Sequence, residues 1–303
     1  MTLPGPLADA LYAATGRAAY AATRIAGGDI NDAWRVELDE RSGDERAARG
    51  RCTRAFVKTR EDAPRGEYTA EAAGLRWLGE PADGLCVPEV LGVAEGDAGA
   101  GGGPRLLALG WLDEGGRGQP EALGRGLAAI HQAGANAFGA PTVMRIGPLT
   151  LPNDPREDWP AFYAEQRLRP LLRPAADRGA LSSDGVAAVE RVCARLPELA
   201  GPPEPPARLH GDLWSGNVLW SGGRPHLIDP VAYGGHREVD LAMLQLFGSP
   251  GPGFLAAYEE RAPLADGRAE RVALWQLFPL LVHAVLFGGG YGAAAERAAR
   301  RYV

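Results

Sequence analysis

The first 112 residues contain short runs in which apolar and polar residues alternate or β-branched and aromatic residues cluster, a pattern typical of β-strands. Strands are expected within 18–38 (two strands around a glycine turn), 55–59, 88–95 and 105–112. Apolar residues spaced by three and four predict helices over 7–15 and 66–80, and the second helix is inserted after the third strand. The chain should therefore begin with a small, mostly antiparallel sheet.

From residue 113 onward the pattern is that of amphipathic helices. They are expected over 119–134, 158–172 and 182–196, and three more helical segments should close the chain. Ser183 or Asp184 should cap the helix at 182–196. The predicted fold class is α+β with two lobes, residues 1–112 and residues 113–303, and a cleft between them.

The composition is that of a cytoplasmic protein. Of the 303 residues 46% are apolar, and the net charge of −6 comes from interspersed acids and bases, which argues against a nucleic-acid or anionic membrane partner. No apolar run reaches the roughly 18–20 residues of a membrane span, and the N-terminus lacks a basic secretory start. Three scattered cysteines favour a reduced compartment without structural zinc. No long heptad predicts the oligomeric state.

Lysine is almost absent from the chain. Of the 32 basic residues 31 are arginine, and Lys58 is the single lysine. A position that keeps its lysine in such a sequence is expected to need a compact ammonium group, which a planar guanidinium does not replace. The alternative is that Lys58 is a chance survivor, so its surroundings have to decide.

The segment RLHGDLWSGNVLW, residues 208–220, places an acid and an amide between apolar residues. Asp212 and Asn217 are five positions apart, and Asp229 follows twelve positions after Asn217, directly behind the apolar run HLI. Protein kinases use this spacing for an Asp that orients the acceptor hydroxyl, followed by an Asn and a second Asp that hold a metal ion. The three residues therefore predict a phosphoryl-transfer centre, in which phosphate charge is neutralised and the acceptor is held in line.

Lys58 fits this prediction. It lies on the third expected strand, and Glu71 follows thirteen positions later on the next helix. In kinases a lysine in this place grips the nucleotide phosphates and a helical glutamate pairs with it. The alternative is a surface ion pair, worth only about 0–1 kcal/mol.

Two further segments are candidates for nucleotide contacts. The turn AGGDIND, with Gly27 and Gly28, stands where a phosphate-covering loop belongs, although an ordinary hairpin would look much the same. The segment between the lobes is the expected hinge, whose backbone groups could hold an adenine edge; its residues are Leu109, Gly110, Trp111 and Leu112. The glycine tract at 96–104 has no phosphate-loop motif and is expected to be a flexible hairpin connection.

Longer motifs make a family resemblance specific. The chain is similar to the fructosamine kinase (ketosamine 3-kinase) family, a branch of the kinase-like fold beside the aminoglycoside and choline phosphotransferases. The matching segments cover nearly the whole chain and are GGDIN, FVKT, AEAAGL, DWPAFYAEQRLRPLL, HGDLWSGNVLW, LIDPVAYGGHREVDLAMLQLFG and PLLVHAVLFGGGY. HGD is shared across the wider phosphotransferase group, whereas WSGN together with YGGHREVDLAM is much narrower.

The resemblance implies a bilobal protein-kinase-like fold and ATP-dependent phosphorylation of the 3-hydroxyl of ketosamines, a deglycation reaction on fructosamine or ribulosamine adducts. Asp212 would orient the acceptor hydroxyl as a general base, an effect of about 10²–10⁴-fold. Asn217 and Asp229 would hold Mg²⁺, while Lys58, oriented by Glu71, would anchor the phosphates of ATP. The substrate would be a small-molecule or protein-bound ketoamine, whose sugar and amine the sequence leaves open.

Three more residues are candidates for substrate contact. Trp214 could be a platform for the sugar or the amine, or simply a buried aromatic residue. His236 and Glu238 follow Asp229 in a loop expected to face the cleft, and they could touch substrate.

Other polar residues of this lobe are expected to act structurally. His210 should brace the catalytic loop through backbone hydrogen bonds, and Asp240 should cap its helix or tie that helix to the catalytic loop. His131 and His283 are expected to pack within helical stretches. Arg167 and Arg169 are expected at the surface or between helices.

Two alternatives to a ketosamine kinase stay open on the sequence. One is another small-molecule phosphotransferase of the aminoglycoside or choline kinase type. The other is a nucleotide-binding module that has lost catalysis, although every polar residue that the chemistry needs is present.

Overall fold

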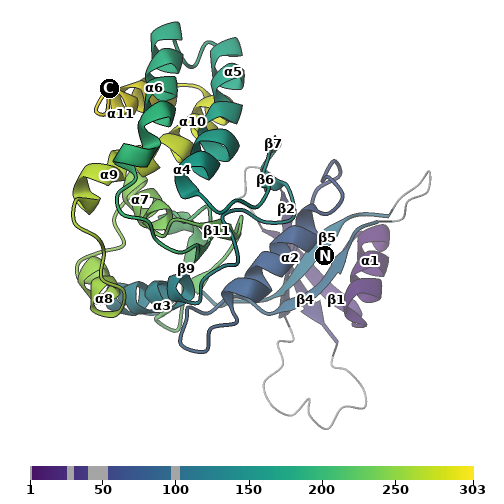
Figure 1. The fold of residues 1–303 in the computed structure, drawn as a ribbon. Coiled ribbons are helices and arrows are strands. Elements are labelled where there is room, and N and C mark those ends of the chain that lie inside the picture. The colour runs from purple at the N-terminus through teal and green to yellow at the C-terminus, as the bar shows by residue number, and fades with distance from the viewer. Residues whose placement is uncertain (1, 26–30, 40–53, 97–102) are drawn as a thin grey trace.

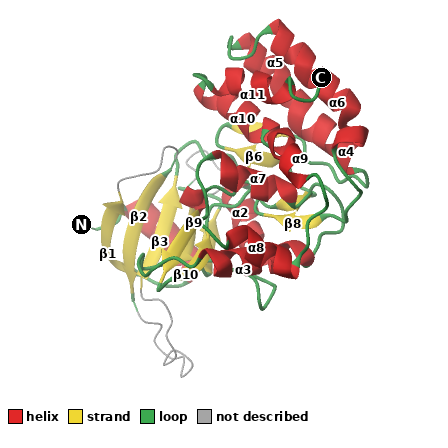
Figure 2. Cartoon of the chain, turned by 90° about the vertical axis from the view of Figure 1, so that its left-hand side faces the viewer, coloured by secondary structure: helices red, strands yellow, loops and turns green. Residues whose placement is uncertain are grey.

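The protein has two lobes, which are connected by the segment between β5 (Leu106–Gly110) and α3 (Pro120–Gln132) (Figure 1). The fold is given by a computed structural model that describes residues 2–25, 31–39, 54–96 and 103–303. The N-terminal lobe is a sheet with a helix on either side, and the other lobe is mostly helical (Figure 2). The predicted α+β architecture is therefore confirmed, whereas the boundary at residue 112 stays a prediction.

The N-terminal sheet has five strands, and every neighbouring pair is antiparallel. Its strand order is β1-β2-β3-β5-β4. The bounds are β1 (Ala19–Ile25), β2 (Asp32–Leu38), β3 (Arg54–Thr59), β4 (Val90–Ala94) and β5 (Leu106–Gly110). Every strand expected in this part of the chain is present.

Two helices cover the two faces of this sheet. Helix α1 (Gly5–Thr15) ends at Gly16, whose φ of +69° stops the helix, and its Leu7 and Leu11 pack against the sheet. Helix α2 (Glu67–Leu78) packs on the opposite face. The sheet thus lies between α1 and α2, as Figure 1 shows.

The alternation of side chains along β3 decides where Lys58 points. Ala55 and Val57 belong to the apolar cluster under α1, whereas Phe56 packs with the cluster under α2. Because successive residues of a strand face opposite sides, Lys58 leaves the sheet toward α2. It lies opposite Ala33 of β2 and Leu107 of β5, which fixes its height along the sheet.

The C-terminal lobe is built from helices. Their bounds are α3 (Pro120–Gln132), α4 (Trp159–Phe162), the π-helical turn η2 (Tyr163–Leu168), α5 (Arg169–Asp177), α6 (Ser183–Leu199), α7 (Glu238–Leu246), α8 (Phe254–Arg261), α9 (Arg268–Trp275), α10 (Leu277–Phe287) and α11 (Tyr291–Ala299). Short antiparallel pairs connect them: β6 (Met144–Ile146) with β7 (Leu149–Leu151), β8 (Ala207–Leu209) with β11 (Tyr233–Gly235), and β9 (Val218–Ser221) with β10 (Arg224–Leu227).

The helical lobe corrects two expectations. Between residues 238 and 299 the structure has five helices where three segments were expected, because glycines and prolines divide the apolar runs. The cap of α6 is Ser182, not Ser183 or Asp184, since the Ser182 hydroxyl accepts the N–H of Gly185 at 3.0 Å. The helix therefore begins one residue earlier than the capping rule suggested.

One apolar stretch is longer than the sequence analysis expected. The segment Arg268–Phe287, which includes α9 and α10, satisfies the length and hydropathy of a membrane span by composition alone. However, 67% of its most apolar window is buried inside the protein, where Trp275 and Leu281 belong to the main core cluster. Packing against the other helices therefore accounts for its apolar character.

Two contacts hold the lobes together beside the site. The guanidinium of Arg208, which lies on β8, donates to the carbonyl of Trp77 at 2.8 Å and to Glu80 at 2.6 Å. On α2 a Cβ at Gly74 would come within 3.1 Å of the Cβ of Ala232, so α2 and the segment after Asp229 are in close contact. The helix that carries Glu71 is thus held directly against the helical lobe.

Candidate active site

The backbone of the loop after β8 is fixed at its first two residues. The N–H groups of His210 and Gly211 donate to the carboxylate of Asp240, at 2.7 and 3.0 Å. Gly211 has a φ of +83°, and a Cβ there would lie 2.1 Å from the carbonyl oxygen of Val231. Both the dihedral angle and the space therefore require glycine at this position.

His210 braces the loop as expected. Its ring is fully buried, and the N–H of Asp212 donates to Nδ1 at 3.3 Å. Nε2 must then carry the proton, and it donates to the carbonyl of Ile228 at 2.9 Å. The imidazole thus connects the residue before Asp229 with the backbone of Asp212, and both of its nitrogens are occupied by these contacts.

Asp212 and Asn217 face each other across this loop. The amide nitrogen of Asn217 donates to the backbone carbonyl of Asp212 at 2.8 Å and to its Oδ2 at 3.2 Å. Burial raises the pKa of the Asp212 carboxyl, while the nearby imidazoles of His210 and His283 act against this rise. A carboxylate that is partly desolvated and held at one oxygen is suited to accept a proton from a hydroxyl group.

Asp229 has a constrained backbone. Its φ is +53°, and within the described residues it is the only non-glycine residue with a positive φ. The N–H of Ile228 donates to the carbonyl of Asn217 at 3.1 Å, so Asn217 is connected to the residue directly before Asp229. Such a conformation costs of order 1–3 kcal/mol and is typical of functional positions.

The tertiary fold brings Lys58 to this acid. Lys58 Nζ lies 2.6 Å from Oε2 of Glu71 and 3.0 Å from Oδ1 of Asp229, a residue 171 positions later in the chain. The Lys58 side chain is 7% exposed and that of Glu71 is 12% exposed, so the surface-pair alternative is wrong. The ammonium group joins the two lobes at the catalytic segment.

Burial and the neighbouring charges together set the pKa values of Lys58, Glu71 and Asp229. Burial alone would lower the pKa of Lys58, but Glu71 and Asp229 outweigh it and raise that pKa, so the ammonium stays charged. Burial raises the pKa of Glu71 to about 7 in spite of the nearby Lys58. Burial acts in the same direction on Asp229, but there Lys58 prevails and lowers the pKa. Asp229 is therefore the firm counter-charge of Lys58.

The donor atoms fit a magnesium ion. Asn217 uses its amide nitrogen toward Asp212, which leaves its amide oxygen for a cation, and the Asp229 carboxylate is half exposed. Carboxylate and amide oxygens are the ligands that Mg²⁺ prefers, usually together with waters and substrate phosphates. The described residues form no cluster of three or more His, Cys, Asp or Glu, so two protein ligands completed by phosphates suit this site better than an all-protein cage.

The remaining expected nucleotide contacts are only partly described. Gly27 and Gly28 lie outside the described residues, as does most of the glycine tract at 96–104. In the hinge the N–H of Gly110 donates to the carbonyl of Glu89 at 2.7 Å, and the N–H of Trp111 donates to that of Arg54 at 3.1 Å. These two groups are already paired within the protein, so a base held there has to use other backbone groups of Leu109–Leu112.

A set of five aromatic side chains lies near the loop at 210–217, and Trp214 and Phe287 are its exposed members. The indole of Trp214 is 40% exposed and covers Gly216, where a Cβ would lie 2.2 Å from the ring. The other members have ring centroids between 4.7 and 6.3 Å apart: Phe247, His283, Phe287 and Tyr291. Gly248 is adjacent to Ser215, and His283 is close enough to act on the Asp212 carboxyl. These five aromatic residues, Trp214 included, are called the aromatic surface below.

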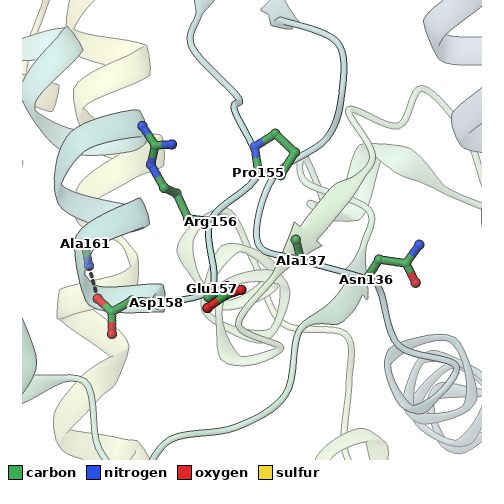
Figure 3. Close-up of a pocket in the computed structure, with 7 residues that line it drawn as sticks. All are labelled: Asn136, Ala137, Pro155, Arg156, Glu157, Asp158 and Ala161. Carbon is green, nitrogen blue, oxygen red and sulfur yellow. Dashed lines mark hydrogen bonds between the residues drawn. The ribbon is translucent and has the colours of Figure 1, made fainter.

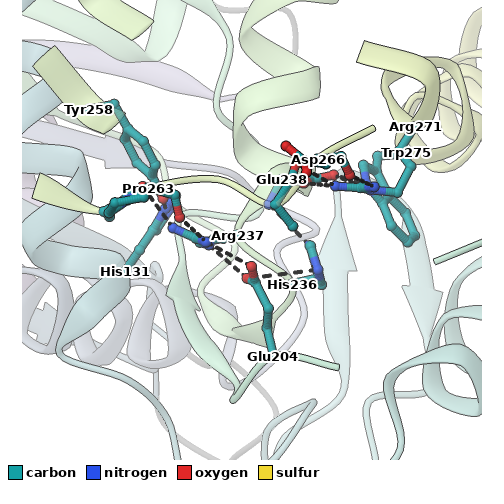
Figure 4. A network of polar contacts seen from close by, with 12 residues as sticks. His131, Glu204, His236, Arg237, Glu238, Tyr258, Pro263, Asp266, Arg271 and Trp275 are labelled. Carbon is teal, nitrogen blue, oxygen red and sulfur yellow. Dashed lines mark hydrogen bonds and ion pairs between the residues drawn. The ribbon is translucent and has the colours of Figure 1, made fainter. Parts of the chain in front are cut away.

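His236 and Glu238 contact other side chains of the helical lobe (Figure 4). Glu238 is 2% exposed, and it accepts the guanidinium of Arg271 at 2.6 and 3.0 Å and the indole N–H of Trp275 at 2.8 Å. The buried ring of His236 stacks on Trp275 with centroids 5.2 Å apart. Both side chains are occupied within the helical core, so the expected substrate contact is replaced by a structural role.

A surface pocket of about 530 Å³ lies elsewhere, between residues 136–137 and the start of α4 (Figure 3). Its polar lining includes Arg156, Glu157 and Asp158, and the Asp158 carboxylate accepts the N–H of Ala161 at 2.8 Å. None of the residues discussed above lines it, so the pocket is separate from the Lys58–Asp229 cluster.

The sequence predicted the roles of Arg167 and His283 only in part. Arg167, expected at the surface or between helices, is fully buried, and its guanidinium stacks 4.2 Å from the ring centroid of Tyr233. His283, expected to pack, belongs to the aromatic surface. The spacing of His283 and Phe287 was the available signal, because residues four apart share one face of α10.

Comparisons with known proteins agree with this geometry. Residues 7–303 match the family described as fructosamine kinase. The chain is 34% identical over 280 residues to a protein of Lactiplantibacillus plantarum named a probable ketoamine kinase, which covers 92% of each chain. A crystal structure described as a "putative fructosamine-3-kinase" from Thermobifida fusca is 46% identical, covers 97% of each chain and superimposes with a TM-score of 0.84.

More distant proteins share this fold. The aminoglycoside phosphotransferase APH(4)-Ia, 16% identical, covers 99% of each chain with a TM-score of 0.61, and this likeness concerns the fold alone. The fold is that of the protein-kinase-like phosphotransferases, as expected. With a family match over nearly the whole chain and a 46% identical relative of known structure, the chain belongs to the fructosamine kinase family.

Proposed function

We propose that this protein transfers the γ-phosphoryl group of ATP to the 3-hydroxyl of ketosamines, the adducts that reducing sugars form with amines. Membership of a kinase family makes it a phosphotransferase. The hydroxyl that is phosphorylated and the deglycation that follows are the proposal. The observation that carries it is the contact of Lys58 with Asp229, because it assembles both halves of a nucleotide site from opposite lobes.

The nucleotide is assigned to the surroundings of this contact. Lys58 is buried, charged and oriented by Glu71 at 2.6 Å, so its ammonium is held ready for phosphate oxygens. Asn217 and Asp229 would hold Mg²⁺, which when bound supplies the positive charge that neutralises the phosphates. Phosphoryl transfer needs little else from the protein than such positioning and charge.

The acceptor is assigned to the other side of Asp212. Its carboxylate is kept in place by Asn217 and by the braced loop backbone, so it can take the proton of an incoming hydroxyl. The aromatic surface begins next to it with Trp214. Flat aromatic faces suit the apolar faces of a sugar chain, and the 59% exposure of Phe287 leaves room for a large amine. This arrangement supports either a free or a protein-bound ketoamine in the cytoplasm.

Turnover of defined ketosamines tests the proposal. Mg-ATP is incubated with Nε-fructosyl-lysine or Nε-ribulosyl-lysine, and ADP release is measured against unmodified lysine and against the 3-deoxy analogue of each sugar. We expect ADP release with the intact adducts only. Phosphorus NMR should place the phosphate on carbon 3 of the sugar.

The variant Asp212→Asn separates catalysis from binding. It should lower turnover by at least 10²-fold while nucleotide affinity, measured by calorimetry, changes less than threefold. Turnover of choline or aminoglycosides in place of ketosamines would assign the protein to another phosphotransferase type. Nucleotide binding without turnover of any of these acceptors would identify a catalytically silent module instead.

A further inference from the structure

A network of buried polar side chains connects the loop at 210–217 with helices α3 and α8. Asp240 is fully buried, and besides the N–H groups of His210 and Gly211 its Oδ2 faces Nε2 of His131 at 3.3 Å. His131 lies near the end of α3 and is 3% exposed. A buried carboxylate needs all of its hydrogen-bond donors, because each missing donor leaves it poorly compensated.

The second nitrogen of His131 is also occupied. Its Nδ1 lies 2.7 Å from the hydroxyl of Tyr258, which α8 supplies, and the two rings meet edge to face with centroids 5.6 Å apart. His131 therefore bridges α8 and Asp240, the residue that fixes the catalytic loop. No substrate or phosphate site is needed to explain its burial.

The protons of this network can be assigned. Nε2 of His131 faces the carboxylate of Asp240, which can only accept, so this nitrogen carries a proton. The hydroxyl of Tyr258 lies 2.7 Å from Nδ1 and can donate to it, which favours the tautomer with its proton on Nε2. In this tautomer His131 gives the Asp240 carboxylate its third donor.

An ion pair fixes α8, which lies at the far end of this network of polar side chains (Figure 4). Arg237 donates to both oxygens of Glu204 at 2.7 Å and to the carbonyls of Ala262 and Pro263 at 2.9 and 2.7 Å. Ala262 directly follows α8. The helix that carries Tyr258 is therefore held to the residue just before α7, on which Asp240 lies.

We propose that His131 is a positioning residue for phosphoryl transfer. By donating to Asp240 it fixes the amides of His210 and Gly211, and through them the direction of the Asp212 carboxylate. It touches neither substrate nor nucleotide. The kinetic part of this proposal rests on the proposed function, whereas its structural part does not.

The test compares two replacements of His131. His131→Leu removes the donor, whereas His131→Gln can place an amide N–H where Nε2 lies. Hydrogen exchange at the amides of His210 and Gly211 should become at least tenfold faster in the Leu variant and should return to within threefold of wild type in the Gln variant. With an active acceptor, kcat should fall at least tenfold for Leu alone, while the KM for ATP stays within threefold.

A cavity variant on the same helix is the control. Leu127→Ala, one turn earlier on α3, removes buried apolar contacts but no polar partner of Asp240. It should lower the melting temperature without changing exchange at residues 210 and 211 or kcat by more than twofold. If it changes them as much as His131→Leu does, or if Leu and Gln are equivalent at position 131, the positioning role is refuted.

Two further comparisons keep the proposal testable when the Leu variant folds poorly. In an Asp240→Asn background His131→Leu should add less than a twofold loss of kcat, because both residues act through one contact; additive losses refute the proposal. Tyr258→Phe should speed exchange at the two amides, whereas Tyr163→Phe, which removes another buried hydroxyl, should not. Hydrogen exchange decides the structural part even if every ketosamine assay is negative.

Discussion

The protonation of Glu71 is a sharp test of how the Lys58 cluster is balanced. Burial raises the pKa of Glu71 from 4.5 to about 7, so the folded protein keeps a proton there that the unfolded chain has released. Between these two values the folded state binds more protons than the unfolded state, and the free energy of unfolding must fall as the pH rises. The variant Glu71→Gln resembles the protonated form and loses this dependence.

The size of the effect follows from the two pKa values. The interval from 4.5 to about 7, at 1.36 kcal/mol per pH unit, gives about 3 kcal/mol in total, of which about 2.5 kcal/mol falls between pH 5 and 8. Relative to Glu71→Gln, the wild-type protein should therefore lose about 2.5 kcal/mol of stability over this range. The pKa changes of Lys58 and Asp229 act outside it, above 10.5 and below 3.8.

Urea unfolding of both proteins at half-unit steps from pH 5 to 8, followed by tryptophan fluorescence, measures the difference. Glu260→Gln, an exposed carboxylate of α8, is the control, and its difference from wild type should stay within about 0.5 kcal/mol. A difference between Glu71→Gln and wild type that stays constant across the range would mean that Lys58 keeps Glu71 ionised, and our account of the cluster would be wrong.

Three further substitutions test other parts of the site. Lys58→Arg should lower kcat/KM with Mg-ATP at least tenfold, or at least about 1.4 kcal/mol, because the forked group cannot replace the compact ammonium; a near-normal rate would mean that the lysine is a chance survivor. Gly211→Ala should destabilise the protein by about 1–3 kcal/mol in thermal unfolding, since its Cβ would lie 2.1 Å from the Val231 oxygen, and an unchanged melting temperature would contradict this packing. Arg167→Met removes the donor to Asn153 and the stacked cation, and should cost about 2–4 kcal/mol in urea unfolding; equal stability would show that the buried cation contributes nothing.

Local structure followed the sequence closely where neighbouring residues decide it. The short buried-type run at 55–59 predicted β3, and Gly16 marked the end of α1, because strand propensity and left-handed caps are properties of a few adjacent residues. The same local reasoning was less reliable at α6, where adjacent serines compete for the cap. It also missed the π-helical turn η2, in which Tyr163 and Arg167 are fully buried.

The sequence also indicated candidate chemistry but not the roles of all the residues near it. Asp212, Asn217 and Asp229 were identified because they lie within 18 positions on one continuous segment. His236 and Glu238 were predicted to contact substrate because they are also near Asp229 in sequence. In the structure both side chains lie in the helical core, where Glu238 accepts from Arg271 and Trp275 and His236 stacks on Trp275. Nearness in sequence says where the backbone passes, whereas the direction of a side chain depends on what packs against it.

By itself, therefore, the amino-acid sequence determined the strands of the N-terminal sheet, most of the helices, the family and the spacing of three polar residues. Only the tertiary structure decided that Lys58 meets Asp229 across 171 positions, and that His131 of α3 faces Asp240 of α7. Propensity, alternation and capping act over a few residues, and so they can be read along the chain. Contacts between distant segments form because apolar faces must be buried together, and that requirement fixes which polar groups are brought face to face.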